Sequence, residues 1–118
     1  MNPIRERAAQ AVRDLPDSVR VGAFDMAIVK WDAAAAAGAH AFGEFCANTQ
    51  EIRIQSGMPS PTKAVDTMIH ELGHAIYWCF YIEDEDKEER TVGTMSGAWT
   101  QVFRDNPWLL DWIKENLS

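Results

Sequence analysis

Two histidines four residues apart, with a glutamate after the first, are the part of this sequence best suited to chemistry. They are His70 and His74 in the run His-Glu-Leu-Gly-His. Residues at this spacing on an α-helix lie on one side, about one turn apart, so both imidazoles can reach a single Zn²⁺ at ~2.0–2.1 Å. Glu71 can then stand beside the ion without binding it and accept a proton from water. The run therefore predicts a zinc site with its own general base.

The apolar pattern around the histidines tests this interpretation, because a short motif can arise by chance. On a helical wheel of ~100° per residue with His70 at zero, His74 falls at about 40°. The apolar side falls opposite, between about 140° and 240°, and consists of Val65, Met68, Leu72, Ala75, Ile76 and Cys79. Core histidines would lie among these residues, so the pattern favours metal binding. It also predicts that Cys79 is a core thiol, and that Tyr77 and Tyr81 lie on the histidine side, where either could donate a hydrogen bond.

A third zinc ligand must come from another part of the chain, because catalytic zinc usually takes three protein ligands and keeps one position open. The remaining histidine, His40, lies upstream. Downstream, Glu85, Glu88 and Glu89 belong to an acidic run that leads into the next predicted helix, where carboxylates are favourable at the N-terminus. The apolar stripe of that helix does not separate Glu88 from Glu89. The residues alone leave all four candidates open.

The order of hydrophobic and turn-forming residues predicts a single domain over residues 1–118, of the α+β class. We expect a small sheet of about three strands, with a long helix packed across it and further C-terminal helices. The predicted helices cover about 4–14, 61–82 and 87–104, with a last one from 107. The predicted strands cover 18–31, with a break near Gly22, then 40–46 and 51–55. Ser60 and Pro61 suit the N-cap and first turn of the long helix.

Composition limits the classes of partner. The chain has 118 residues, 47% of them apolar, and a formal net charge of −7. This charge repels phosphate backbones, so we expect no direct binding to nucleic acid. No apolar run approaches the ~20 residues of a membrane helix, and the N-terminal residues lack the apolar core of a secretion signal. With only Cys46 and Cys79, which are too few for a disulfide framework, we expect a reduced cytoplasmic protein.

The segment 66–76 (DTMIHELGHAI) resembles the metal helix of the ImmA/IrrE-type and SprT-like minimal zincins, most of all the short metallopeptidase-like proteins of phages and prophages. In the ImmA/IrrE type, the third ligand is a glutamate with a small apolar residue three positions later and a larger one six positions later. Glu89, followed by Val92 and Met95, matches this spacing. The resemblance covers roughly residues 40 to 110, and includes 102–107 (VFRDNP). It implies a zincin-like fold and one catalytic Zn²⁺ held by His70, His74 and Glu89.

These features together predict a zinc-dependent metallopeptidase that hydrolyses a protein or peptide substrate, with Glu71 as the catalytic base. The strand 51–55 is the candidate edge strand for pairing with an extended peptide. The alternative is a zinc-binding interaction module without turnover, in which the metal joins two helices and Glu71 has no task. A protease acting on DNA-bound proteins is a third hypothesis, which the acidic charge disfavours. The sequence identifies no substrate and leaves the oligomeric state open.

Overall fold

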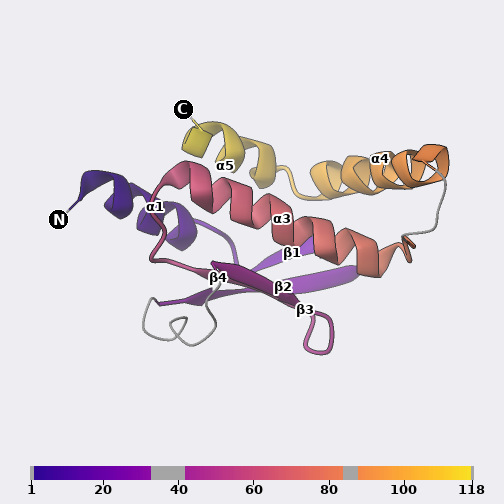
Figure 1. Cartoon of the computed structure of the whole chain (residues 1–118), viewed down its shortest axis with the longest axis horizontal. Coiled ribbons are helices and arrows are strands. Elements are labelled where there is room, and N and C mark those ends of the chain that lie inside the picture. Colours follow the sequence, from indigo (N-terminus) through magenta and orange to yellow (C-terminus); the bar gives the residue numbers. More distant parts are fainter. Residues whose placement is uncertain (1, 33–41, 84–87, 118) are drawn as a thin grey trace.

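The computed structural model describes residues 2–32, 42–83 and 88–117. The described helices lie on one side of a four-stranded sheet, and the longest of them, α3, runs across it (Figure 1). In chain order the elements are α1 (Pro3–Arg13), β1 (Ser18–Val21), β2 (Phe24–Trp31), β3 (Gly43–Cys46), β4 (Glu51–Gln55), α3 (Pro61–Cys79), α4 (Glu88–Asp105) and α5 (Trp108–Leu117). The expectation of a sheet combined with helices is confirmed.

The sheet is mixed, with strand order β1-β2-β4-β3. β1 and β2 are antiparallel, β2 and β4 are parallel, and β4 and β3 are antiparallel. The described strands exceed the predicted three because the stretch 18–31 folds back on itself. The break lies at Gly22, whose φ of +61° is in the left-handed region that glycine adopts without a steric penalty. A break predicted from composition is therefore a hairpin turn between two paired strands.

The prediction that strand 51–55 lies at the sheet edge is wrong. β4 lies between β2 and β3, and β3 is the edge strand beside α3. The alternation of isoleucine with polar residues in β4 has another cause. Ile52 and Ile54 are buried under the helices, whereas the residues between them face the opposite side of the sheet. Alternation shows that a sheet has one covered and one open face, and it does not separate an inner strand from an edge strand.

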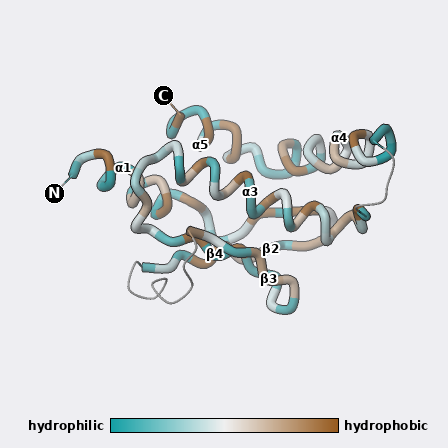
Figure 2. Tube along the Cα trace, in the orientation of Figure 1, coloured by the Kyte–Doolittle hydropathy of each residue, from teal (hydrophilic) through white to brown (hydrophobic). Residues whose placement is uncertain are grey.

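The hydrophobic core lies between this covered face and the helices. Figure 2 shows hydrophobic positions recurring along the strands and along α3 above them. The buried strand residues are Val19, Val21, Met26, Ile28, Ile52 and Ile54, and the apolar residues that α3 adds are Ala64, Val65, Met68, Leu72, Ala75 and Ile76. Each large side chain of this kind contributes roughly 1.5–3 kcal/mol when fully buried. None of the described helices is both long and apolar enough to cross a bilayer.

Helix α3 begins as predicted and ends earlier than predicted. The Ser60 side chain is the N-cap and accepts a hydrogen bond from the Lys63 amide at 3.1 Å, with Pro61 at the first helical position. The helix ends at Cys79, and Tyr81 has a left-handed φ of +54°. The prediction of a helix through residue 82 is therefore wrong at its C-terminal end. The other described helices begin next to their predicted first residues.

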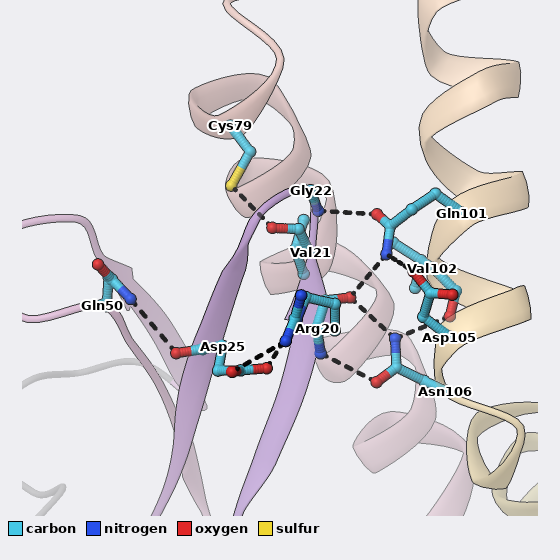
Figure 3. Close-up of polar contacts among 10 residues, drawn as sticks. All are labelled: Arg20, Val21, Gly22, Asp25, Gln50, Cys79, Gln101, Val102, Asp105 and Asn106. Atoms are coloured by element: carbon cyan, nitrogen blue, oxygen red, sulfur yellow. Dashed lines mark hydrogen bonds and ion pairs between the residues drawn. The ribbon is translucent and has the colours of Figure 1, made fainter.

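The C-terminal end of helix α4 is attached to the outer edge of β1 by two side-chain amides, one in the helix and one in the residue that follows it (Figure 3). Asn106, which is 4% exposed, accepts a hydrogen bond from the Arg20 backbone N–H at 2.9 Å and donates one to the Arg20 carbonyl at 2.8 Å. Gln101 accepts a hydrogen bond from the Gly22 N–H at 2.7 Å. These bonds replace the strand partner that the edge of β1 lacks, so they close this edge to another chain.

Gly43 allows β3 to lie directly against α3. A Cβ atom at this position would stand 2.8 Å from Cγ2 of Thr67 and 3.0 Å from the carbonyl oxygen of Arg53. Both distances are shorter than ordinary van der Waals contact, and the Arg53 carbonyl belongs to a paired strand that cannot move easily. The absence of a side chain at Gly43 therefore sets the spacing between the edge strand and the helix that carries the histidines.

We predict that Gly43→Ala destabilises the protein by about 1–3 kcal/mol, because the added methyl group overpacks the contact between β3 and α3. Urea unfolding followed by tryptophan fluorescence measures the change. The matched control is Gly97→Ala in α4, where a Cβ atom meets nothing within 4 Å. That variant should be more stable than the parent by about 0.5–1 kcal/mol, because alanine has the higher helix propensity. Equal stability of the two variants would contradict the close approach at Gly43.

Candidate functional site

The two histidines lie on the exposed side of α3, as predicted. Met68, Leu72 and Ile76 on the opposite side are fully buried. The Nε2 atoms of His70 and His74 are 3.1 Å apart, and the ring centroids are 4.8 Å apart. Two nitrogens at ~2.1 Å from one tetrahedral ion would be separated by about 3.4 Å. The pair is therefore close to the arrangement in which both rings bind one cation, and α3 need not change shape.

Glu71 is 6% exposed, although it follows an exposed histidine in the sequence. The rotation of ~100° per residue places it at the border of α3 that faces β3. There its carboxylate accepts a hydrogen bond from the Phe45 backbone N–H. Burial raises the pKa of the Glu71 carboxyl group, and the Glu44 carboxylate raises it further; the two imidazoles and the Phe45 N–H oppose this shift. A raised pKa makes a carboxylate a better proton acceptor near neutral pH.

The backbone of the edge strand β3 presents polar groups next to this helix. The Phe42 carbonyl accepts a hydrogen bond from the Gln55 N–H at 2.9 Å, so residue 42 belongs to a hydrogen-bonded pair with β4. Such pairs alternate along an antiparallel ladder, which means that Gly43 and Phe45 turn their N–H and C=O groups away from β4. The Phe45 N–H meets Glu71, and the other outward groups lie along the same edge.

A cavity of about 600 Å³, called here the β3 pocket, lies between β3 and α3. Its lining residues are Gly43, Glu44, Phe45, His70, Glu71, His74, Tyr77 and Trp78. Sequence reasoning missed Glu44, which forms an ion pair with Arg53 across the β3–β4 hairpin. The turn at 47–50 sets a register that places Glu44 opposite Arg53, so alignment of the two strands about that turn would have found it.

The structure brings together two of the predicted metal ligands, His70 and His74. Within residues 2–32, 42–83 and 88–117, no three His, Cys, Asp or Glu side chains are close enough to hold one metal ion. Glu88 and Glu89 are exposed in the first turn of α4 and do not form such a group with the histidine pair. The other two candidates, His40 and Glu85, lie outside the described residues. Glu89 as the third ligand stays a prediction.

The two tyrosines differ in their relation to the site. Tyr77 lines the β3 pocket and is 37% exposed, so its phenol lies within the cavity wall. Tyr81 follows the end of α3 and is 86% exposed. Its predicted place on the histidine side assumed that the helix continued through it, and that assumption is wrong. Of the two, the structure supports only Tyr77 as a potential hydrogen-bond donor at this site.

Comparisons with protein-family models, with curated proteins and with solved structures found no match. The resemblance to minimal zincins therefore stays a prediction based on the motif. What the structure adds is the arrangement of the residues: an exposed histidine pair, a buried carboxylate and an edge strand around one cavity.

Cys79 packs toward the core, as the helical wheel predicts. Its thiol lies 3.5 Å from the Val21 carbonyl oxygen, to which it donates a hydrogen bond (Figure 3), and burial raises the pKa of the thiol to about 11. Cys46, on β3, has the opposite behaviour, because hydrogen bonds from Thr49 lower the pKa of its thiol. The same helix rotation that exposes the histidines therefore turns Cys79 toward the core, where it is partly buried.

We predict that iodoacetamide alkylates Cys46 much faster than Cys79 at pH 8, because the thiolate is the reactive form and only ~0.1% of a thiol with a pKa near 11 is ionised there. Peptide mapping by mass spectrometry gives the two rates. In 8 M urea the two thiols should react at similar rates, which controls for local sequence. If Cys79 reacts as fast as Cys46 in the folded protein, the rotation of α3 described above is incorrect.

Proposed function

We propose that this protein is a zinc-dependent metallopeptidase of the minimal zincin type, in which His70 and His74 hold the metal and Glu71 is the general base. One observation carries the proposal: two exposed imidazoles 3.1 Å apart adjoin a buried carboxylate at the wall of a cavity bordered by an edge strand. A purely structural metal site would have no use for the carboxylate. Burying it there costs free energy, and a catalytic task accounts for that cost.

The residues present fit a zinc ion. Imidazole nitrogens are preferred zinc ligands, and the separation of the Nε2 atoms suits two adjacent positions of a tetrahedron. The proposed third ligand is Glu89, which rests on the family resemblance; Glu89 does not group with the histidine pair in the described residues, so zinc binding by it requires the start of α4 to move toward the histidines. When bound, Zn²⁺ supplies Lewis-acid chemistry, which makes water more acidic and polarises a carbonyl group.

Glu71 performs the proton transfers in this proposal. It accepts a proton from the attacking water molecule and delivers it to the leaving amine when the peptide bond breaks. The hydrogen bond from the Phe45 N–H holds one side of the carboxylate against β3, so the carboxylate keeps a defined position beside the histidines. Its burial under β3 limits competition from bulk water. Tyr77 is placed to donate a hydrogen bond to the substrate from the cavity wall.

The proposed substrate is an extended segment of a protein or peptide that pairs with β3. The outward N–H and C=O groups of Gly43 and the outward C=O group of Phe45 provide a donor and acceptors for such a strand, because the Phe45 N–H is already bonded to Glu71. At the other edge of the sheet, the side chains of Gln101 in α4 and of Asn106 just after it are hydrogen-bonded to the backbone groups of Arg20 and Gly22. Strand addition is therefore directed to the edge next to Glu71 and the histidines.

We expect Glu71→Gln to keep zinc and to lower peptide hydrolysis by about 10²-fold or more, the usual contribution of a general base. Zinc content is measured by elemental mass spectrometry, and turnover by release of fluorescein from labelled casein. Asp66→Asn, on the exposed side of the same helix, is the matched control and should behave as the parent does. A Glu71→Gln variant that cleaves at the parental rate would rule out the base assignment. Parental protein that binds zinc and cleaves nothing would support the interaction module instead.

Replacing the proposed third ligand should weaken zinc binding and leave the fold intact. We expect Glu89→Gln to raise the Kd for zinc by about tenfold or more. Loss of a residue that only hydrogen-bonds to a metal ligand already has an effect of this size, and loss of a ligand should have at least as large an effect. Competition with a chromophoric chelator measures this Kd. The matched control is Glu88→Gln, which removes the same charge from the neighbouring position in the same turn and should retain parental affinity. A parental Kd for Glu89→Gln would exclude Glu89, and a raised Kd for Glu88→Gln would transfer the assignment to that residue.

A further inference from the structure

A second cavity, called here the Trp99 pocket, adjoins the histidine pair and has a volume of about 560 Å³. It lies between α3 and α4, and its lining residues are Ile69, His70, Gly73, His74, Tyr77 and Trp99. His70, His74 and Tyr77 also line the β3 pocket. The histidine pair therefore forms part of the wall of both cavities.

The two cavities differ in chemistry. The β3 pocket has Glu44 and Glu71 among its lining residues, whereas the described walls of the Trp99 pocket are aliphatic or aromatic apart from the imidazoles. Ile69 is 40% exposed, and it lies with Tyr77 on the surface of α3 that the core does not use. Exposed apolar side chains gathered beside a polar site are typical of a binding surface.

The walls of the Trp99 pocket belong to packed helices. Trp99 stacks on Phe103, with ring centroids 5.6 Å apart and an interplanar angle of 26°. The adjacent positions Ala98 and Val102 are fully buried, and they fix α4 against the rest of the protein. The pocket therefore exists before a ligand arrives, which limits the ordering cost of binding.

Gly73 provides space inside this pocket. A Cβ atom built on Gly73 meets nothing within 4 Å, although the residue lies between the two histidines in the sequence. A ligand group can thus approach the backbone of α3 at this point. Together with the aromatic wall, this space suits a bulky apolar group; a charged group would lose its hydration there without a counter-charge.

We propose that the Trp99 pocket receives one large apolar side chain of the peptide substrate, of the phenylalanine, leucine or methionine class, and that Trp99 and Ile69 set this preference. The inference rests on the proposed function. A peptide paired with β3 has its backbone in the β3 pocket, and the histidine pair is shared by both cavities. A side chain next to the cleaved bond can therefore pass over the histidines and enter the Trp99 pocket.

The first test measures binding and needs no turnover. The full chain, with and without added zinc chloride, is titrated with N-acetyl-L-phenylalanine amide and followed by amide and indole NMR signals. We expect shifts at Ile69, Gly73 and Trp99, and no comparable shifts with N-acetylglycine amide. Ile69→Ala and Trp99→Ala should weaken binding by about threefold or more, because each removes apolar contact area. Leu110→Ala, on the exposed side of α5, is the control and should bind as the parent does.

Two results of this titration would overturn the proposal. One is the absence of shifts at Ile69 and Trp99 up to the solubility limit of the phenylalanine probe. The other is that the chemical shifts of Ile69 and Trp99 change with protein concentration and do not change when the probe is added. That result would mean that a second copy of the chain occupies the pocket.

The second test measures specificity. Zinc-loaded parent is incubated with a mixed peptide library, and the cleaved bonds are read by mass spectrometry. We expect enrichment of large apolar residues at one position beside the cleaved bond, and a loss of this enrichment by about tenfold in Trp99→Ala. Cleavage without such a preference overturns the pocket assignment and leaves the proposed function standing. Probe binding without cleavage of any peptide overturns the proposed function, and with it the assignment to a substrate side chain.

Discussion

The packing of one side of α3 against the sheet determines where every residue of the candidate site lies. Met68, Leu72 and Ile76 are fully buried on that side, and together they contribute several kcal/mol to stability. Because residues four apart share a side of a helix, their burial leaves His70 and His74 exposed and adjacent. Rotation of α3 by one residue would put Glu71 in the place of Leu72 and His74 in the place of Ala75 in the core. The hydrophobic contact and the histidine geometry are consequences of the same constraint.

The contact between α3 and β3 adds the remaining part of the site. Glycine at position 43 lets the edge strand approach Thr67 closely, and this approach buries Glu71. A buried carboxylate is unfavourable unless it is hydrogen-bonded, and the Phe45 N–H provides part of that compensation. Since burial raises the pKa of Glu71, its contribution to folding stability is present in acid and is lost as the pH rises through its folded-state pKa. Above that pKa the ionised carboxylate is therefore held at the expense of stability.

Helix α4 has two separate effects on the surroundings of this site. Through Gln101, together with Asn106 just after its end, it closes the edge of β1, which leaves β3 as the open edge of the described sheet. Through Trp99 it forms an apolar wall beside the histidines. Trp99 and Gln101 lie in the last two turns of α4 and Asn106 follows its last residue, so the attachment to β1 also holds the aromatic wall in place. The polar and apolar cavities on the two sides of the histidine pair follow from this arrangement.

Local patterns in the sequence were sufficient to predict the parts of the protein that depend on residues close along the chain. The start of α3 at Ser60 and Pro61, the exposed histidines and the inward Cys79 follow from capping and from the helical period, which act over a few residues. Only the tertiary structure decided that β4 is an inner strand, that Glu44 and Phe45 adjoin Glu71, and that Trp99 lies beside the histidines. Strand order and helix docking depend on contacts between residues far apart in the chain, and neither periodicity nor composition records those contacts.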